Sequence, residues 1–442
     1  MRILTRCGAK AIVVMLLSVL SSCKESVATN PVDTAIAPFT NGGNERNMIV
    51  VISDIHLGAD LAYAECNKNR GALSELLERI RVAPAVKELV IAGDMLDEWF
   101  VPATIDTYQG KDQRDFVLRI AENNKGVFDV LNSIIQSGTI LVTYVPGNHD
   151  LSISPENVDL ILPGIHQARD VRLGLGTYSP ADYSAIAIEH GHRYNFFCAP
   201  DPISNQEIAS GTIQPPGYFY ARIGALHILQ NYPLAGATLP VLIANTLGGE
   251  SQNLLYGYWK VWQWAINYLT IRNAFDDKII VTNVNGFTGT FSVNDLVPFQ
   301  SIAGGTIDVN LYKGIQDSWG LRQTLNNVAV RIPTAQAIAN AASVTETDDQ
   351  ARIQYFENPD SEKRIVILGH THVAKIISSV NHKGQKAIYA NTGTWIDDNR
   401  GKPTMSFVVI TEQNAEQSSQ AYVKLYNVDG GVVTRMAQDS LR

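Results

Sequence analysis

The sequence lacks the features that mark several specialised classes of protein. It has no excess of positive charge, since 35 Lys and Arg stand against 43 Asp and Glu and give a formal net charge of −8. Proteins that bind nucleic acid normally present a basic face, so this balance argues against nucleic acid as the main partner. There is no long low-complexity tract, and 45% hydrophobic with 18% charged residues is typical of a globular protein. A chain of 442 residues suits roughly two or three domains, or one large domain with an insertion.

The apolar run near the N-terminus is too short to cross a membrane. It covers residues 11–17 and follows the positive residues Arg2, Arg6 and Lys10, whereas a membrane-spanning helix needs about 20 apolar residues. This order is typical of a targeting signal. Residues 20–23 read Leu-Ser-Ser-Cys, which resembles the end of a bacterial lipoprotein signal, where the cysteine is lipidated and becomes the first mature residue. The alternative is a plain secretory signal with a cysteine at its cleavage site.

The N-terminal pattern predicts how this part of the chain is used. Residues 1–22 would be a lipoprotein signal peptide, and Cys23 would carry the lipid. Residues 23–45 are rich in Ser, Thr, Asn, Pro and Gly and are typical of a flexible tether. We therefore expect a protein of the bacterial cell envelope, anchored to the membrane by its lipid and facing either the periplasm or the cell surface.

Cysteine is scarce in the rest of the chain. Of four cysteines, Cys7 would leave with the signal and Cys23 is the lipidation candidate, so that only Cys66 and Cys198 remain. An envelope location permits a disulfide between these two. Two separate buried thiols are an equal alternative, because pairing depends on geometry that the sequence does not give.

From about residue 47 the chain alternates apolar runs with helical patterns, which indicates an α/β fold. Leu73, Leu76, Leu77 and Ile80 predict a helix with one apolar face, and residues 113–136 also have a helical pattern. Further strands are predicted at about 386–390, 405–411 and 420–427. Five earlier strands share one design, an apolar run whose end carries Asp, Asn or His. They are 48–52 with Asp54 and His56, 88–92 with Asp94 and Asp97, 139–145 with Asn148, His149 and Asp150, 184–188 with His190 and His192, and 364–368 with His370 and His372.

Residues 201–345 interrupt this rhythm and are predicted to be an inserted cap or lid. The segment contains two helix-like stretches rich in aromatic residues, the second of which carries Trp259, Trp262 and Trp264. We interpret these tryptophans as the core of the inserted subdomain. Contact between one or two of the rings and a substrate is the less favoured alternative.

The polar strand ends supply the ligands that divalent metals prefer. Carboxylate, amide oxygen and imidazole suit Mn, Fe or Zn. Seven donors exceed the needs of one ordinary site, but they suit two metals that share a bridging carboxylate and lie about 3.5–4 Å apart. The remaining histidines at 166, 227 and 382 lack this setting and are interpreted as ordinary packed or solvated residues. The seven candidate ligands are Asp54, His56, Asp94, Asn148, His190, His370 and His372.

The ordered blocks resemble the calcineurin-like metallophosphoesterase superfamily. They are Asp54-x-His56, Gly93-Asp94-x-x-Asp97, Gly147-Asn148-His149-Asp150, His190-Gly-His192 and Gly369-His370-Thr-His372. They cover roughly residues 47–198 and 360–427, and residues 391–395, Asn-Thr-Gly-Thr-Trp, resemble the strand end that often follows the last histidines. The resemblance implies a four-layer α/β/β/α sandwich of two mixed sheets flanked by helices. The catalytic domain would be discontinuous, 46–200 and 346–442, around a mainly helical cap at 201–345.

The resemblance also implies roles for the residues and a dinuclear metal centre of Mn, Fe, Zn or a mixture. Asp54, His56 and His372 would hold one metal. The other would be held by Asn148, His190 and His370, with Asp94 bridging the two.

A hydroxide bridging the metals would attack phosphorus, and His149 would stabilise charge or protonate the leaving oxygen. Asp150 would orient His149 and raise its pKa. His192 would either support a metal ligand or contact substrate, and Arg193 would contact substrate, while Asp97 is interpreted as a cap of the following turn or helix.

The predicted function is therefore hydrolysis of a phosphorylated small molecule or an extended phosphoester by two metals. Cleavage of a phosphodiester or a nucleotide pyrophosphate is the alternative within the same class. The block from Gly93 to Trp99 resembles relatives that cleave UDP-diacylglucosamine, but those tend to have Arg at the place of His149. From a different class, a non-catalytic surface lipoprotein that binds phosphate ligands is the weaker alternative, because every candidate ligand and His149 are present.

Overall fold

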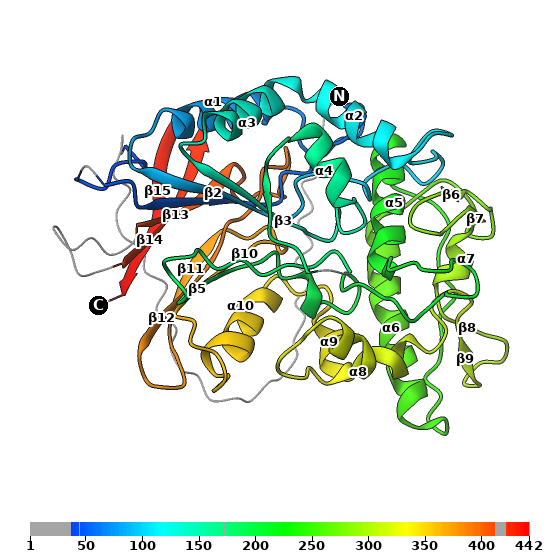
Figure 1. Cartoon of the computed structure of the whole chain (residues 1–442). Coiled ribbons are helices and arrows are strands. Elements are labelled where there is room, and N and C mark those ends of the chain that lie inside the picture. Colours follow the sequence, from blue (N-terminus) through cyan, green and yellow to red (C-terminus); the bar gives the residue numbers. More distant parts are fainter. Residues whose placement is uncertain (1–36, 44, 171–172, 412–420, 442) are drawn as a thin grey trace, which may run out of the picture.

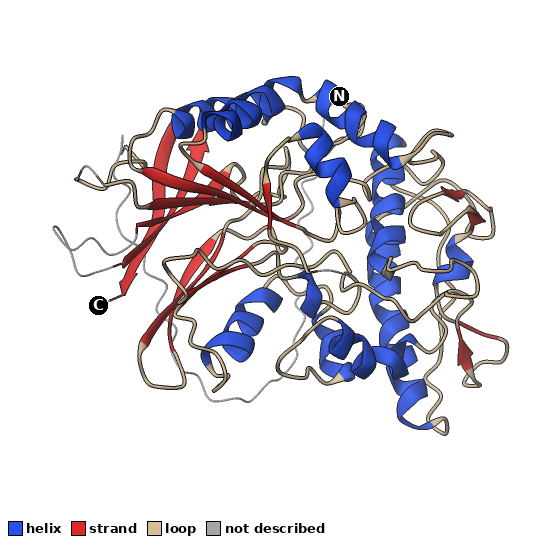
Figure 2. Ribbon diagram, in the orientation of Figure 1, coloured by secondary structure: helices blue, strands red, loops and turns tan. Residues whose placement is uncertain are grey.

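The computed structural model describes residues 37–43, 45–170, 173–411 and 421–441 (Figure 1). The predicted signal peptide, Cys23 and most of the predicted tether lie outside these residues. Two sheets dominate the fold and pack face to face (Figure 2). Among the described residues, no helix is both long and apolar enough to cross a membrane.

The first sheet has seven strands in the order β15-β14-β13-β1-β2-β3-β4. Strands β1 to β4 run parallel to one another, and β13, β14 and β15 continue the sheet with antiparallel pairings. Their bounds are β1 Met48–Ile52, β2 Val86–Ala92, β3 Leu141–Val145, β4 His166–Gln167, β13 Ser406–Thr411, β14 Ala421–Asp429 and β15 Val432–Leu441.

The second sheet has four strands in the order β11-β12-β10-β5. Strands β12, β10 and β5 are parallel, and β11 is antiparallel to β12. Both sheets are therefore mixed, as predicted. The bounds are β5 Ile186–Ile188, β10 Ile365–Leu368, β11 Lys375–Val380 and β12 Lys386–Asn391.

Helices cover the outer face of each sheet. On the first sheet lie α1 (Arg70–Arg81), α2 (Gln113–Asn123), α3 (Lys125–Ser137) and α4 (Pro155–Ile161), and on the second lie α10 (Glu346–Ala351) and the π-helical turn Arg352–Phe356. The layer between the sheets is a mainly aliphatic core, because inward-facing residues of both sheets are buried against one another. The predicted four-layer α/β/β/α sandwich is confirmed. Its central layer includes Ile49, Val51, Val90, Val145, Ile188, Ile367, Ile388, Val408 and Ile410.

Local sequence explains where the covering helices begin and end. Helix α1 buries Leu73, Leu76, Leu77 and Ile80, the face that the apolar spacing predicts. The predicted helical region 113–136 is two helices that meet at Asn124, and the second ends at Gly138 in the left-handed conformation with φ 63°. A glycine is favoured at this position because it has no Cβ to clash.

The interval 201–345 contains helices and two small sheets. Its helices are α5 (Pro216–Leu229), α6 (Gly249–Tyr268), α7 (Val293–Leu296), α8 (Ile315–Leu325) and α9 (Thr334–Asn340), and its strand pairs are β6–β7 (Ile280–Thr282, Gly289–Phe291) and β8–β9 (Phe299–Gln300, Ile307–Asp308). Figure 1 shows these elements together beside the strand ends of the sandwich. Of the three tryptophans predicted to be core, Trp259 and Trp262 are buried, but the prediction is wrong for Trp264, which is 51% exposed because it lies on the outer side of α6.

The two cysteines among the described residues are free thiols. Cys66 is buried, and Cys198 is half-buried. Burial raises the pKa of the Cys66 thiol to about 12, so this group stays protonated and unreactive at neutral pH. Of the two alternatives that the sequence left open, the structure has the separate thiols.

Candidate metal centre

The carboxyl ends of the parallel strands bring the predicted ligands to one edge of the sandwich. Strands β1, β2 and β3 of the first sheet end there, and so do β5 and β10 of the second. Ligand sites of α/β folds lie outside this end of a parallel sheet. Both sheets contribute, so the site lies across the junction between them.

Five of the seven predicted ligands have a left-handed backbone, which residues with a Cβ rarely adopt. Such strain persists only where the surrounding fold holds it, and it clusters at functional sites. The five residues come from three strand ends, so one local turn cannot account for them. Their φ angles are 52° at Asp54, 55° at His56, 51° at Asp94, 70° at His370 and 57° at His372.

One group of donors is formed by Asp54, His56 and His372. The Nε2 atoms of the two histidines face each other at 3.2 Å, and Oδ1 of Asp54 lies 3.2 Å from Nε2 of His372. These three atoms lie within 4.8 Å of one another, close enough to share one metal ion. This is the ligand set predicted for the first metal.

A second group is centred on His190. Its Nε2 lies 3.1 Å from Oδ2 of Asp94, 3.1 Å from Oδ1 of Asn148 and 4.0 Å from Oδ1 of Asp54. The other ring nitrogen, Nδ1, bonds to the carbonyl of Ala92 at 3.0 Å. That bond places the proton on Nδ1 and leaves Nε2 free to act as a ligand.

Asp94 links the two groups, and His370 lies beside the second. Oδ2 of Asp94 is 3.1 Å from the His190 ring and 3.7 Å from Nε2 of His56, so one carboxylate reaches both. The His370 ring lies edge-on to the His190 ring with centroids 5.2 Å apart. Burial is the main cause that lowers the pKa of His370, to about 3. His370 is therefore neutral, as a metal-binding imidazole must be.

Two glycines leave room for the carboxylates. A Cβ at Gly147 would collide with Oδ1 of Asp94, and a Cβ at Gly369 would collide with Oδ2 of Asp54. The Asp94 and Asp54 carboxylates also accept backbone N–H bonds, from His149 at 2.8 Å and from His370 at 3.0 and 3.1 Å. Glycine is therefore required at positions 147 and 369, because the carboxylates lie too close to the backbone there to leave room for a Cβ.

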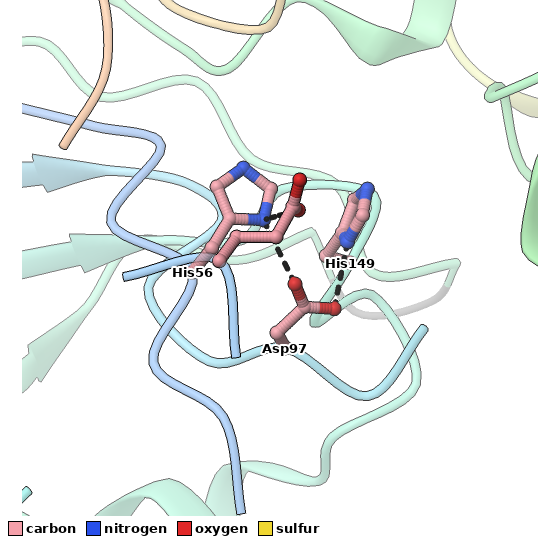
Figure 3. Close-up of side chains that lie close together, drawn as sticks. His56, Asp97 and His149 are labelled. Carbon is pink, nitrogen blue, oxygen red and sulfur yellow. Dashed lines mark hydrogen bonds and ion pairs between the residues drawn. The ribbon is translucent and has the colours of Figure 1, made fainter. Parts of the chain in front are cut away.

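Asp97 holds both His149 and His56, as Figure 3 shows. Its Oδ1 accepts a bond from Nδ1 of His149 at 2.7 Å, and its Oδ2 accepts one from Nδ1 of His56 at 3.0 Å. Oδ1 also accepts the N–H groups of Trp99 and Phe100, so the predicted capping role is confirmed as well. Sequence reasoning missed the second role of Asp97, for which the only signal was its position three residues after Asp94.

The prediction that Asp150 orients His149 is wrong. Both oxygens of the buried Asp150 carboxylate point into the turn, where they accept the N–H groups of Gly147 at 2.7 Å, Met95 at 2.8 Å and Leu96 at 3.2 Å. These bonds lock the turn after β3 to the turn after β2. Asp150 therefore shapes the backbone that presents Asn148 and His149.

The electrostatics around His149 favour its charged form. Burial alone lowers the pKa of the His149 imidazole, but the carboxylates of Asp97 and Asp94 more than offset this and raise the pKa above its usual value. The ring is 14% exposed and packs at 5.0 Å against Trp99. With Nδ1 donating to Asp97, the free nitrogen is Nε2.

The two residues predicted to contact substrate are both buried. Arg193 pairs with Glu189 at 2.8 Å and donates to Thr177 and the carbonyl of Asn326, so its guanidinium is fully engaged inside the protein and the prediction is wrong for it. His192 lies 5.4 Å from the His190 ring, and neither of its ring nitrogens has a hydrogen-bond partner among the described residues. His192 therefore packs against the ring of His190, the predicted ligand.

Glu65 is a further carboxylate of the site that the sequence did not reveal. Its Oε2 lies 3.5 Å from Nδ1 of His56, and its side chain is 20% exposed. Glu65, His56, Asp97 and His149 bring four donor atoms within 4.8 Å of one another. The strand-end pattern could not include Glu65, because it lies in the loop between β1 and α1.

The comparison with protein families agrees with the fold and the donor set. Residues 48–212 match the family model of the calcineurin-like phosphoesterases. The match is to a family of phosphoesterases and supports the activity proposed below. The match ends before β10 and does not cover His370 and His372. The structure brings these two residues to the site.

Two other comparisons add little. A search of the curated proteins finds no match. Among solved structures, the chain is similar to the nuclease MPE of Pseudomonas putida, with 15% identity over 33% of this chain and a TM-score of 0.20. The matched part spans about half of the nuclease, 54% of its length. A likeness at this level does not bear on substrate.

Proposed function

We propose that this protein hydrolyses phosphoesters with two divalent cations bound at the shared edge of the two sheets. The observation that supports this proposal most directly is that two donor groups, each of three or more residues, adjoin through Asp94 and Asp54. One cation would be held by Asp54, His56 and His372, and the other by Asn148, His190 and His370. Asp94 would bridge them, because its Oδ2 reaches both groups.

The donor chemistry fits such ions. Nitrogen and oxygen ligands without thiolates suit Mn, Fe or Zn. When bound, the two cations supply Lewis acidity that activates water and neutralises charge on the phosphoryl oxygens. The fixed tautomers of His56 and His190, each donating Nδ1–H to an oxygen, keep both Nε2 atoms free for ligation.

His149 is assigned the acid at the leaving group. Asp97 holds its Nδ1–H at 2.7 Å and fixes the ring, so that Nε2 is the atom that donates a proton to the departing oxygen. Trp99 packs on the ring and limits its rotation. Asp97 acts through His149 and is therefore a positioning residue.

The substrate is proposed to be a phosphorylated small molecule or an extended phosphoester. The insertion at 201–345 stands beside the strand ends, and Trp99, which packs on His149, also contacts Tyr218 of α5 at 6.3 Å. Because the insertion contacts Trp99, which packs on His149, it is well placed to control which leaving groups reach His149. We propose that the insertion controls access.

The protein is proposed to act at a membrane of the bacterial envelope, anchored through a lipid on Cys23. The N-terminal signal pattern supports this proposal. The test is metabolic labelling with a radioactive fatty acid in the parent and in Cys23→Ser. We expect label in the parent alone, and label in both chains would contradict the assignment.

Hydrolysis is tested with an aryl phosphate and a bis-aryl phosphodiester, using the full-length chain loaded with manganese. Hydrolysis of the monoester alone supports a phosphatase, and hydrolysis of the diester supports the alternative, a diesterase or pyrophosphatase. Turnover of neither ester by a chain with bound manganese would contradict the proposal and favour a phosphate-binding lipoprotein. His149→Ala is the control variant for contaminating phosphatase.

A further inference from the structure

The insertion exposes aliphatic side chains at the corner where α6 begins. Val241, Ile243 and Leu247 lie in the segment before α6 and are 79%, 54% and 97% exposed. Phe299 and Ile302 lie in the β8–β9 hairpin and are 38% and 76% exposed. We call these five residues the apolar patch.

Hydrogen bonds join the two segments that carry the apolar patch. Ile243 donates its N–H to the side chain of Gln300 at 3.0 Å, and Gln300 donates back to the carbonyl of Ile243 at 2.7 Å. Gln252 of α6 bonds in the same two-way manner to the backbone of Ile307. Figure 1 shows β8 and β9 beside the lower end of α6. The apolar patch is therefore one surface on a common framework.

The segments that carry the apolar patch have no charged residue. Neither residues 223–249 nor residues 296–307 contain Asp, Glu, Lys or Arg. Surfaces that face water are normally rich in charges of both signs. A group of exposed apolar side chains on an uncharged surface marks an interaction site.

We propose that the apolar patch docks on the surface of a lipid bilayer. Leu247 and Val241 protrude and do not line a groove, since 97% and 79% of their surface is exposed. Protruding aliphatic residues suit a fluid partner that closes around them, as acyl chains do, whereas a protein partner requires matching pockets.

The length of chain before the described residues fits this partner. This inference rests on the proposed lipid at Cys23. Ala37, the first described residue, lies 14 positions after Cys23. Fourteen residues span at most about 50 Å when fully extended. An anchored domain therefore stays at the bilayer, where a weak patch is sufficient to fix its orientation.

The test places a polarity-sensitive fluorophore on the apolar patch of the full-length chain. The probe is attached at Leu247→Cys, and the matched control carries it at Val82→Cys, which is 66% exposed at the end of α1, on the side of the molecule away from α6. Both chains are mixed with vesicles of phosphatidylcholine and phosphatidylglycerol. We expect a blue shift and quenching by spin-labelled lipid that are at least fivefold greater at 247 than at 82. In a Val241→Ser, Ile302→Ser background, quenching at 247 is expected to fall at least twofold.

Several results would overturn the proposal. They are equal quenching at the two positions, failure of the chain to sediment with vesicles, and quenching at 247 that the Ser background leaves unchanged. A blue shift at 247 without vesicles that grows with protein concentration would show that a second copy covers the apolar patch. The readout does not use phosphoesterase activity, so it is independent of the outcome for the proposed function.

Discussion

Oδ1 of Asp97 lies 2.7 Å from Nδ1 of His149, and the other oxygen of the same carboxylate holds His56. One buried carboxylate thus sets the ring of the proposed acid and the tautomer of a proposed metal ligand. The proposed metal binding and the proposed proton donation would therefore be coupled through Asp97, which also caps the turn that follows it.

Asp97→Asn should impair both functions. Asparagine keeps one acceptor oxygen for His149 and the turn, but it presents an amide N–H₂ group to Nδ1 of His56. His56 must then carry its proton on Nε2, where the metal would bind. Partners of metal ligands typically contribute about 10- to 100-fold in affinity or activity, and we expect losses in this range in manganese affinity and in kcat. Unchanged manganese binding in D97N would contradict the role assigned to Asp97.

His149→Ala and Asp94→Ala should separate chemistry from metal binding. His149 is not one of the proposed ligands, so H149A should retain its metals and lose about 10²- to 10⁴-fold in kcat. Asp94 bridges the two donor groups, so D94A should lose metal and activity together. Elemental analysis of the purified chains, paired with kinetics, distinguishes the two. Normal turnover by D94A would refute the dinuclear site.

Gly147→Ala tests the close approach of backbone and ligand. The added Cβ would overlap Oδ1 of Asp94 and displace the proposed bridge. We expect manganese affinity to fall at least tenfold. Gly126→Ala is the matched control, because a Cβ there meets only Ser74 Oγ at 3.5 Å, an ordinary contact on α3. Equal manganese affinity in the two variants would show that the glycine is not required.

The pH dependence of stability is predicted at Glu346, a buried carboxyl at the start of α10. Burial raises the pKa of this carboxyl to about 8, although a bond from Asn195 at 2.5 Å works in the opposite direction. Between pH ~4.5 and 8 the folded chain therefore keeps a proton that the unfolded chain has lost. This term lowers the unfolding free energy by ~1.4 kcal/mol for each pH unit of rise across that window.

Glu346→Gln should remove this term while keeping the acceptor for Asn195. We expect denaturant unfolding to show Glu346→Gln more stable than the parent at pH 8, with the gain shrinking toward pH 5. A stability difference that is the same at both pH values would contradict the assignment.

The sequence predicted the strands that have strong apolar runs and missed others whose apolar pattern is weak. β1, β2, β3 and β10 each contain an apolar run, so their positions and the polar residues at their ends could be read directly. β11 alternates buried, half-buried and exposed residues, and β15 is a mostly half-buried edge strand. Their apolar pattern is too weak to predict a strand.

The ligands could be predicted but the partner of His149 could not. Each ligand directly follows a buried strand, and parallel strands deliver their ends to one edge. Which carboxylate reaches the His149 ring depends on how the turn after β3 faces the turn after β2. Asp150 is adjacent in sequence, yet three backbone N–H groups hold its carboxylate away from the ring. The carboxylate that contacts the ring belongs to Asp97, which lies 52 positions before His149 in the sequence.

The most direct test of the central claim is a titration of the metal-free, full-length chain with manganese, in which bound metal and hydrolysis of an aryl phosphate are measured on the same samples. The two adjoining donor groups predict saturation at two ions per chain, with turnover rising only as the second ion binds. Saturation at one ion with full turnover, or two bound ions with hydrolysis of neither the aryl phosphate nor the diester, would contradict a dinuclear phosphoesterase.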